Sequence, residues 1–316
     1  MGPSRSVSRC RESAPSRRSH EQPCDQRFES QSHKVATPTL DRLSQHDFQR
    51  LAEFIQGYSG IKMPPSKKTM VEGRLRRRLR AVGATTLAEY YDYLFNQGGL
   101  DAEAVHLIDA VTTNKTDFFR EPDHFRFLIN RALPDLLAHR RLGGLSTIKV
   151  WSAACSIGAE PYTLAMVLAE FGRTAAGFRS SIVATDICTE VLQTAKLGIY
   201  PQAMIDPIPH DLRARYLLRA KEGAGDRFRI APELRRLVAF GRVNLMEPPY
   251  AVDRDMHVIF CRNILIYFDK PTQCAVLEQI CGHLRSGGLL FLGHSETLTG
   301  PGLPLRLVGT NVFLRQ

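Results

Sequence analysis

The segment Ile148-Lys-Val-Trp-Ser-Ala-Ala-Cys-Ser-Ile-Gly-Ala-Glu-Pro161 decides the fold of this chain. Its first part, Ile148–Ser152, is a short apolar run typical of a buried parallel strand, and a helical stretch, Pro161–Glu170, follows. A strand, a loop of small residues and a helix N-terminus form a nucleotide-binding corner. The loop holds one glycine, Gly158, and it has neither the dinucleotide fingerprint nor the lysine of a phosphate-binding loop. These features favour a cofactor without phosphates, such as S-adenosylmethionine, but a tight structural turn explains the loop equally well.

Strands and helices continue to alternate through the rest of the chain. Three further apolar runs and a helical stretch are found at Ile182–Thr185, Val258–Cys261, Thr272–Leu284 and Leu289–Gly293. Such alternation implies right-handed crossovers, so we predict an α/β fold with a doubly wound, mostly parallel sheet over residues 111–316. The polar, turn-rich region of about residues 200–241 breaks this rhythm, and we interpret it as a small inserted β subdomain.

The residues before this region divide into two parts. Residues 1–36 are rich in Ser, Arg and Gln with almost no apolar periodicity, so we expect a disordered basic tail. Residues 37–110 carry apolar side chains at helical spacing, for example Phe48, Leu51 and Ile55. We therefore predict a helical N-terminal domain there.

Composition restricts the class of protein. Of 316 residues, 43% are hydrophobic and 23% are charged, as in a soluble globular protein. No apolar run has the length needed to cross a bilayer, and the N-terminus lacks the apolar stretch of a secretory signal. The seven cysteines form no C-x-x-C pair and no cluster with zinc spacing. We therefore expect a cytoplasmic protein with reduced, buried cysteines and no metal.

Most of the formal net charge of +10 comes from one segment. Lys67–Arg80 holds seven basic residues and one acidic residue. An apolar stripe marks one face of the helix expected there, at Val71, Leu75, Leu79 and Val82. The stripe leaves the arginines, among them Arg74, Arg77 and Arg78, for the other faces. From charge alone the segment is a solvated face, an RNA-binding surface or a docking surface for an acidic protein.

Polar residues follow two of the predicted strands, at the end where open α/β sheets bind ligands. Asp186 lies roughly 20–30 residues after the glycine loop, which suits either contact with ribose hydroxyls or an N-cap of the following helix. Arg262 and Asn263 close a later strand. Tyr267 follows four residues further on, either at the rim of the same crevice or as a half-buried aromatic.

The segment before the first strand places a single arginine beside two aromatic residues. It reads Thr113-Asn-Lys-Thr-Asp-Phe-Phe-Arg-Glu121. Arg120 pairs either with a carboxylate inside a site or with Glu121 or Asp123 at the surface, and without further context the surface pair is favoured.

These segments resemble the chemotaxis receptor methyltransferases of the CheR family. The matching motifs are N-x-T-x-F-F-R-E at Asn114–Glu121, C-R-N-x-x-I-Y-F-D at Cys261–Asp269 and G-H-S-E at Gly293–Glu296, in the family's order. The resemblance covers nearly everything after residue 40. It implies a helical N-terminal domain, a linker, a class I methyltransferase domain and a small β subdomain. The implied activity is transfer of a methyl group from S-adenosylmethionine to receptor glutamates, with S-adenosylhomocysteine as the second product.

The resemblance also implies roles for the residues that match the family's motifs. It implies that Asn114, Thr116 and Arg120 contact the methionine end of the cofactor, and that Glu160 and Asp186 are acidic cofactor contacts, with Asp186 on the ribose. Asn244 and Leu245 are implied to lie on the adenine side, and Arg262 and Asn263 elsewhere in the pocket. Arg120 and Tyr267 are implied to assist methyl transfer. One departure is Ala159, where the family often has a second acidic residue.

The implied partner is the cytoplasmic helical region of a chemoreceptor in membrane arrays. Because the resemblance implies that this receptor region is an acidic helix bundle, it assigns substrate docking to Arg74, Arg77 and Arg78. Some family members also bind a receptor tail peptide through the β subdomain. Here the segment Glu222–Arg229 offers a hairpin for that purpose.

Two alternatives compete with this interpretation. A nucleic-acid methyltransferase would suit the basic charge, and Glu247-Pro-Pro-Tyr250 superficially resembles the Pro-Pro-aromatic motif of base methylation. That motif should close the strand Val258–Cys261 but here precedes it, so we expect no nucleic-acid partner. The second alternative is a non-catalytic receptor-binding or signalling module on the same scaffold. The residues that argue against it are Arg120, Asp186, Asn263 and Tyr267.

Overall fold

The computed structural model describes residues 41–138, 147–221, 225–298 and 302–316. The expected tail, residues 1–36, lies outside these ranges. Within them, helices precede a seven-stranded, mostly parallel sheet, and a separate three-stranded sheet is inserted between two of its strands. This is the α/β architecture that the sequence predicts. In the same ranges, no helix combines the length and apolar character needed to cross a membrane.

The N-terminal part is helical throughout, and its turns are set by local capping. Its elements are α1 (Gln45–Ser59), the 3₁₀ turn η1 (Pro65–Lys67), α2 (Lys68–Val82), α3 (Leu87–Phe95) and α4 (Leu100–Val111). The hydroxyl of Ser44 caps α1 by accepting from the N–H of Asp47 at 3.0 Å, and Thr86 caps α3 in the same way. Helix α1 ends at Gly60, whose φ of 75° requires glycine.

The main sheet has the strand order β6-β2-β1-β7-β8-β10-β9. Its strands are β1 (Ile148–Ala153), β2 (Ser180–Asp186), β6 (Val238–Arg242), β7 (Met256–Cys261), β8 (Leu284–Leu292), β9 (Leu305–Gly309) and β10 (Val312–Arg315). The first five are parallel to one another, while β10 is antiparallel to both β8 and β9. Chain order reverses beside β1, so the carboxyl ends of β1 and β7 flank the switch point where such sheets bind ligands.

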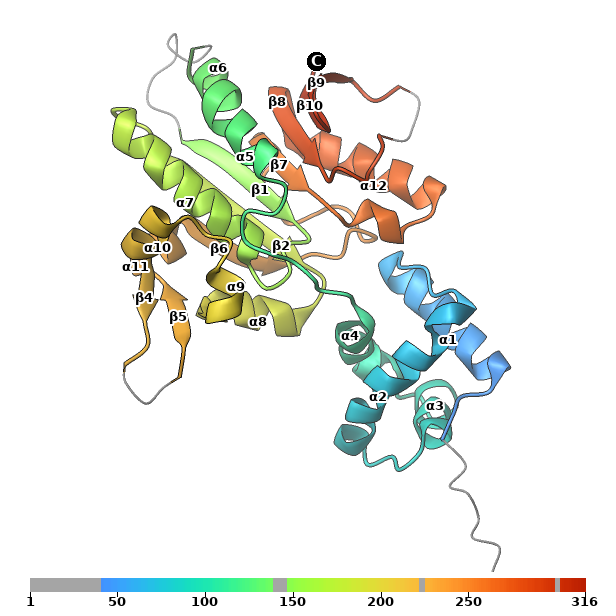
Figure 1. Cartoon of the computed structure of the whole chain (residues 1–316). Coiled ribbons are helices and arrows are strands. Elements are labelled where there is room, and N and C mark those ends of the chain that lie inside the picture. The colour runs from blue at the N-terminus through green and yellow to red at the C-terminus, as the bar shows by residue number, and fades with distance from the viewer. Residues whose placement is uncertain (1–40, 139–146, 222–224, 299–301) are drawn as a thin grey trace, which may run out of the picture. The chain divides into compact units, whose positions relative to one another are not determined.

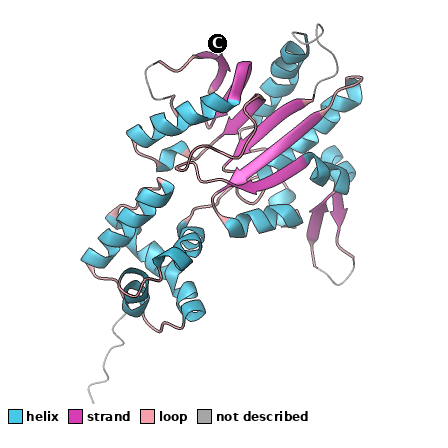
Figure 2. Cartoon of the chain, turned by 180° about the vertical axis from the view of Figure 1, so that it is seen from behind, coloured by secondary structure: helices cyan, strands magenta, loops and turns pink. Residues whose placement is uncertain are grey.

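Helices cover both faces of this sheet (Figures 1 and 2). They are α5 (Pro122–Phe127), the π-helical turn η2 (Leu128–Ala132), α6 (Leu133–Ala138), α7 (Ala159–Thr174), α8 (Thr189–Leu197), η3 (Leu265–Tyr267) and α12 (Lys270–His283). Alternate residues of β7 enter different cores: Val258 packs in the core that contains α7, and Ile259 packs in the core that contains α12. The second core also includes the buried residues of α1–α4, so the helical part and the sheet share apolar packing.

The inserted β subdomain is present, but its end differs from the prediction. It contains β3 (Ile199–Pro201), α9 (Gln202–Ile205), α10 (His210–Tyr216), β4 (Leu217–Arg219), β5 (Arg227–Ile230) and α11 (Pro232–Leu237). Residues 238–241, which the sequence analysis placed in the insertion, instead form part of β6 and pair in parallel with β2. β6 is a short edge strand with a mixed burial pattern, so its apolar signal is weak.

Candidate functional site

The carboxyl ends of β1, β2 and β7 border a cavity of about 250 Å³. All ten residues that the sequence analysis assigned to cofactor binding or catalysis line it, namely Asn114, Thr116, Arg120, Glu160, Asp186, Asn244, Leu245, Arg262, Asn263 and Tyr267. They come from the linker after α4, from the end of β2, from the start of α7 and from the segments that follow β6 and β7. The fold thus gathers them at the topological switch point, where the parallel strands predict a ligand site.

The loop between β1 and α7 brings backbone close to this cavity. Ala154 and Ser156 adopt positive φ angles of 58° and 51°, which are uncommon for residues with a side chain. Gly158 follows at 91°, and a Cβ there would lie 2.9 Å from the Cβ of Ala195. The loop therefore needs glycine for close approach as well as for its turn, and strained backbone of this kind clusters at functional sites.

Asp186 is held by the backbone of two loops. Its carboxylate accepts from the N–H of Ser156 at 2.8 Å and from the N–H of Cys188 at 2.9 Å. Burial raises the pKa of Asp186, although these amide hydrogen bonds oppose that shift. The N-cap interpretation is wrong, because the first amide of α8, at Thr189, donates instead to Asp109 of α4. Asp186 therefore lines the cavity without serving as a helix cap.

A buried arginine ties together the loops around the cavity. Arg262, whose side chain is 2% exposed, lies 3.1 Å from a carboxylate oxygen of Glu160 and 2.9 Å from one of Glu121. It also donates to the carbonyl of Arg120 at 2.5 Å. Burial raises the pKa of Glu160, and the charge of Arg262 opposes that rise. Because one guanidinium holds three chain segments, Arg262 fixes the relative positions of β7, α7 and the linker.

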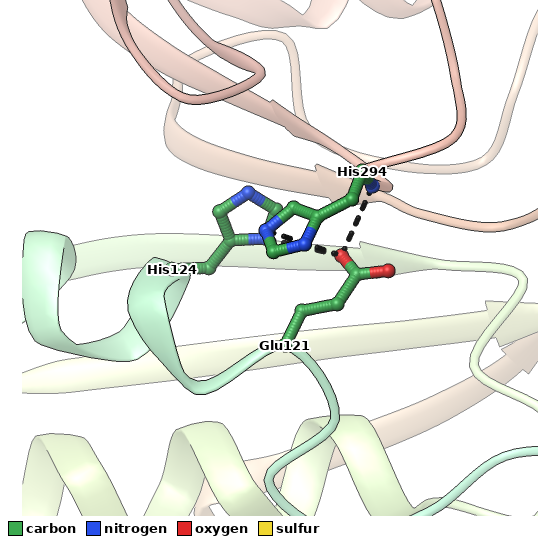
Figure 3. Close-up of side chains that lie close together, drawn as sticks. All are labelled: Glu121, His124 and His294. Carbon is green, nitrogen blue, oxygen red and sulfur yellow. Dashed lines mark hydrogen bonds and ion pairs between the residues drawn. The ribbon is translucent and has the colours of Figure 1, made fainter.

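Glu121 is a central residue that the sequence analysis did not assign to the site. It begins the turn into α5, and His124 and His294 lie around it (Figure 3). The ligand atoms of these three residues lie within 4.8 Å of one another. The Glu121 oxygen nearest both rings is also the one that pairs with Arg262. That positive charge disfavours a cation in the cluster, so we interpret Glu121 as a positioning residue.

The protonation of this cluster agrees with a positioning role. Burial raises the pKa of Glu121, but the hydrogen bond and charge of Arg262 outweigh it and leave the pKa lowered. Burial and the charge of Arg262 lower the pKa of His124 to about 4. The ring Nε2 of His124 lies 3.0 Å from the carbonyl of Thr310, so it carries the proton of the neutral ring. An ionised Glu121 beside a neutral His124 is therefore the state expected at pH 7.

Glu296 fixes the loop that carries Asn263 and Tyr267. Its carboxylate, 5% exposed, accepts from four backbone N–H groups at 2.6–2.8 Å, those of Asn263, Ile264, Leu265 and Gly293. A Cβ on Gly293 would lie 2.5 Å from Nδ2 of Asn263 and 2.9 Å from a carboxylate oxygen of Glu296, so a side chain there would displace both groups. Burial raises the pKa of Glu296. The signal for this role was the G-H-S-E motif, to which the sequence analysis assigned no function.

The helical part supplies one wall of the cavity. Ser59, Ile61, Met63 and Lys67 line it from the segment between α1 and α2. Backbone contacts hold this wall in place, because the N–H of Lys62 donates to the carbonyl of Tyr267 at 3.0 Å. The site is therefore built from both parts of the chain.

The amide of Asn244 is already used by the protein. Its Nδ2 donates to the carbonyl of Tyr58 at 2.7 Å and to Glu247 at 2.8 Å, and its oxygen accepts from the N–H of Met246. Asn244 thus joins the loop after β6 to the end of α1. An adenine contact at this position, as the resemblance implies, would use the backbone or the neighbouring Leu245.

The linker places Arg120 at the cavity, where its side chain contacts the linker backbone. Its guanidinium donates to the carbonyl of Lys115 at 3.3 Å. The two acids expected to pair with it at the surface have other partners, since Glu121 pairs with Arg262 and Asp123 pairs with Arg126. The linker is further held by Asn114, whose carbonyl accepts from the hydroxyl of Ser156 at 2.8 Å.

Two of the three arginines assigned to docking have partners within the chain. Arg78 forms two hydrogen bonds of 2.7 Å to Glu103, and Arg74 donates at 2.7 Å to the carbonyls of Val111 and Thr112. Arg77 is exposed. Arg74 and Arg78 thus use polar groups of α4 and the linker as partners, and docking by the three arginines stays a prediction.

Comparisons with known proteins cover both parts of the chain. The family model described as "CheR methyltransferase, all-alpha domain" matches residues 46–112, and "CheR methyltransferase, SAM binding domain" matches residues 114–313. The chemotaxis protein methyltransferase 2 of Pseudomonas aeruginosa is 39% identical over 272 residues, 85% of this chain and 93% of that protein. The chemotaxis protein methyltransferase of Escherichia coli is 38% identical over 272 residues, 86% of this chain and 91% of that protein.

Proposed function

Because this chain belongs to the CheR family of S-adenosylmethionine-dependent methyltransferases, we propose that it methylates glutamate side chains of chemoreceptors and forms methyl esters. One observation carries the choice of a carboxylate substrate. Three acids among the described residues line the cavity, and two of them, Glu160 and Asp186, already accept a hydrogen bond on each oxygen, from Arg262, Ser152 and backbone amides. These bonds leave lone pairs for ligand hydroxyls but fix the two carboxylates, and the third acid, Asp117, is exposed. A hydroxyl nucleophile requires a proton acceptor, whereas a glutamate with a pKa of about 4.3 is already anionic at pH 7.

The cavity residues suit the family's cofactor. S-adenosylmethionine, when bound, supplies an electrophilic methyl group on a sulfonium. The glycine loop presents backbone and small side chains with no phosphate cradle, and Asp186 lines the cavity beyond β2 with its carboxylate fixed by amides. We propose that Asp186 accepts from the ribose hydroxyls. Asn114, Thr116 and Arg120 would hold the methionine end, with Leu245 beside the adenine.

The chain's part in the reaction is mainly alignment. In the transfer, the glutamate oxygen bonds to the methyl carbon as the carbon–sulfur bond breaks, and no proton moves. The reacting atoms must lie in line, roughly 3 Å apart. We propose that Arg120 orients the substrate carboxylate and that Tyr267 donates a hydrogen bond near it. Glu296 and Arg262 would act as positioning residues, because they fix the two segments that carry these side chains.

The Pro-Pro-aromatic motif, which favoured the nucleic-acid alternative, has a packing role in the structure. Tyr250, the aromatic of Glu247-Pro-Pro-Tyr250, is 5% exposed, and its hydroxyl donates to the carbonyl of Leu245 at 2.7 Å. Its ring packs against Trp151 and His283. A tyrosine used in this way has a packing role and is not available to stack on a base.

We further propose that the enzyme acts in the cytoplasm, where it is recruited to receptor arrays. The β subdomain has strand order β3-β5-β4, which leaves β4 at an edge where an extended receptor tail peptide can add a strand. Residues 222–224 of the expected hairpin lie outside the described residues, so the peptide site remains a proposal.

The test is radiolabelled methyl transfer to chemoreceptor-enriched membrane vesicles, with alkaline release of methanol as the signature of an ester. We expect label in the receptor and none in added RNA. Asp186→Asn preserves shape but removes the charge, and we expect cofactor affinity measured by calorimetry to fall about 10-fold to 100-fold. Label in RNA, or label that resists alkali, would exclude glutamate esterification. Unchanged affinity in Asp186→Asn would remove Asp186 from the ribose contact.

A further inference from the structure

The helical part contributes a lysine to the cavity. Lys67 ends η1 and lines the cavity, and its ammonium nitrogen lies 5.6 Å from the centroid of the Tyr267 ring. A cation over an aromatic face at this distance is attracted by the ring, so the two side chains hold each other in place. The backbone hydrogen bond from Lys62 to Tyr267 fixes their separation further. Lys67 thus lies against a proposed catalytic residue, and a backbone hydrogen bond ties the segment that precedes Lys67 to the same residue.

This lysine has no acidic partner in the described ranges, where its ammonium donates to the carbonyl of Lys62 at 3.5 Å. It is half-buried, and burial together with the charge of Arg74 lowers its pKa. A partly desolvated cation without a counter-ion attracts anions more strongly than a solvated surface lysine does. The geometry therefore leaves an anion-binding position at the cavity, beside Tyr267.

We propose that Lys67 receives the carboxylate of the incoming substrate, so that the helical part selects an anionic side chain at the active site. This inference rests on the proposed glutamate methylation. Transfer from a sulfonium to a carboxylate cancels charge, so the bound substrate carries more negative charge than the transition state. A nearby cation therefore stabilises the bound substrate at least as much as the transition state. Loss of this cation should therefore raise the KM for receptor without lowering kcat.

The experiment compares Lys67→Met with Lys68→Met in methyl transfer to chemoreceptor-enriched vesicles. Each variant loses one charge at adjacent positions, but Lys68 does not line the cavity. We expect Lys67→Met to raise the KM for receptor about 5-fold to 10-fold, with kcat within about 2-fold and cofactor affinity unchanged by calorimetry. Lys68→Met should change KM by less than about 2-fold. Lys67→Arg, which restores the charge, should recover most of the loss.

Salt separates a site contact from general steering. A deficit caused by lost steering shrinks as ionic strength rises, because salt screens exposed charges. The deficit of Lys67→Met should persist at roughly 0.5 M salt, since the position is partly buried. Equal KM values for the two variants, or a lower kcat at unchanged KM, would overturn the role of Lys67. Failure of the wild-type protein to label receptor would instead overturn the proposed function.

Discussion

The loop after β7 and helix α2 both carry arginines that the sequence marks as functional, yet the structure uses them differently. Arg262, at the head of the loop, points inward and contacts two carboxylates and a carbonyl. On α2, Arg74 and Arg78 contact their own part of the chain, and Arg77 remains exposed. A position at the carboxyl end of a parallel strand predicts where a side chain lies, because the fold converges there. A count of charges on a helix does not predict where the side chains lie, because the count does not show which of them have partners within the chain.

The largest effect should come from Arg262→Met, which tests whether the loop arginine is structural. The replacement leaves Glu121 and Glu160 near each other without their cation. Removing one partner of a buried charge network costs about 3–5 kcal/mol. We expect a loss of that size in the free energy of unfolding in urea, together with loss of cofactor binding. A stability within about 0.5 kcal/mol of the wild type would show that solvent replaces the guanidinium.

A smaller effect on the free energy of unfolding is expected for Arg78→Met, which tests whether Arg78 stabilises the helical part or docks substrate. The side chain of Glu103 is 5% exposed and that of Arg78 is 25% exposed. We therefore expect the free energy of unfolding to fall by about 2–3 kcal/mol at pH 7, less than for a fully buried pair. The receptor KM of the folded protein should stay close to that of the wild type. Docking by Arg78 would give the opposite pattern, a raised KM with unchanged stability.

The pH dependence of Arg78→Met gives a second check. The hydrogen bond from Arg78 lowers the pKa of Glu103. A depressed folded pKa contributes stability that is present above the unfolded value of about 4.3 and is lost as pH falls through the folded value. The stability difference between wild type and Arg78→Met should therefore narrow as pH falls below about 4. A constant difference from pH 7 to 3 would show that the lost contribution is packing of the side chain.

The same contrast shows how much the sequence predicts. Apolar runs locate the strands, which predicts the α/β fold and a ligand site beside Asp186, Arg262 and Asn263. The roles of other cavity residues, for example Asn114 and Asn244, are predicted only by the resemblance to the CheR family.

The sequence does not reveal Glu121, Glu296 or Lys67 as parts of the site. Glu121 and Glu296 act on backbone and on other side chains across gaps of more than 30 residues, which no local pattern records. Lys67 lies within a charge run, and only tertiary packing distinguishes it from its neighbours.

Tyr267→Phe should have a smaller effect, a lower kcat for methyl transfer without a change in cofactor affinity. The variant removes a hydroxyl from a residue that lines the cavity but keeps the ring beside Lys67. Loss of one hydrogen bond is worth about 1 kcal/mol, so we expect kcat to fall roughly 5-fold to 10-fold with cofactor affinity unchanged. Single-turnover methyl transfer and calorimetry measure the two quantities. Wild-type kcat would assign Tyr267 to packing alone.

The smallest effect is expected for Arg77→Ala, which tests whether the exposed Arg77 docks substrate. Replacing Arg74, Arg77 and Arg78 together is a poor test, because it also removes the partner of the buried Glu103. Among these three arginines Arg77 is the exposed one, so its loss should change the free energy of unfolding by less than about 0.5 kcal/mol. Exposed charges act mainly on encounter, and we therefore expect the receptor KM to rise about 2-fold to 3-fold at low salt. The difference should vanish at roughly 0.5 M salt, where the Debye length falls to a few ångströms. Arg77→Lys, which keeps the charge, is the matched control and should behave as wild type. If Arg77→Ala matches the wild type at low salt as well, Arg77 is simply solvated. Docking then depends on other groups, either Arg76 and Arg80 of α2 or the cavity wall that carries Lys67.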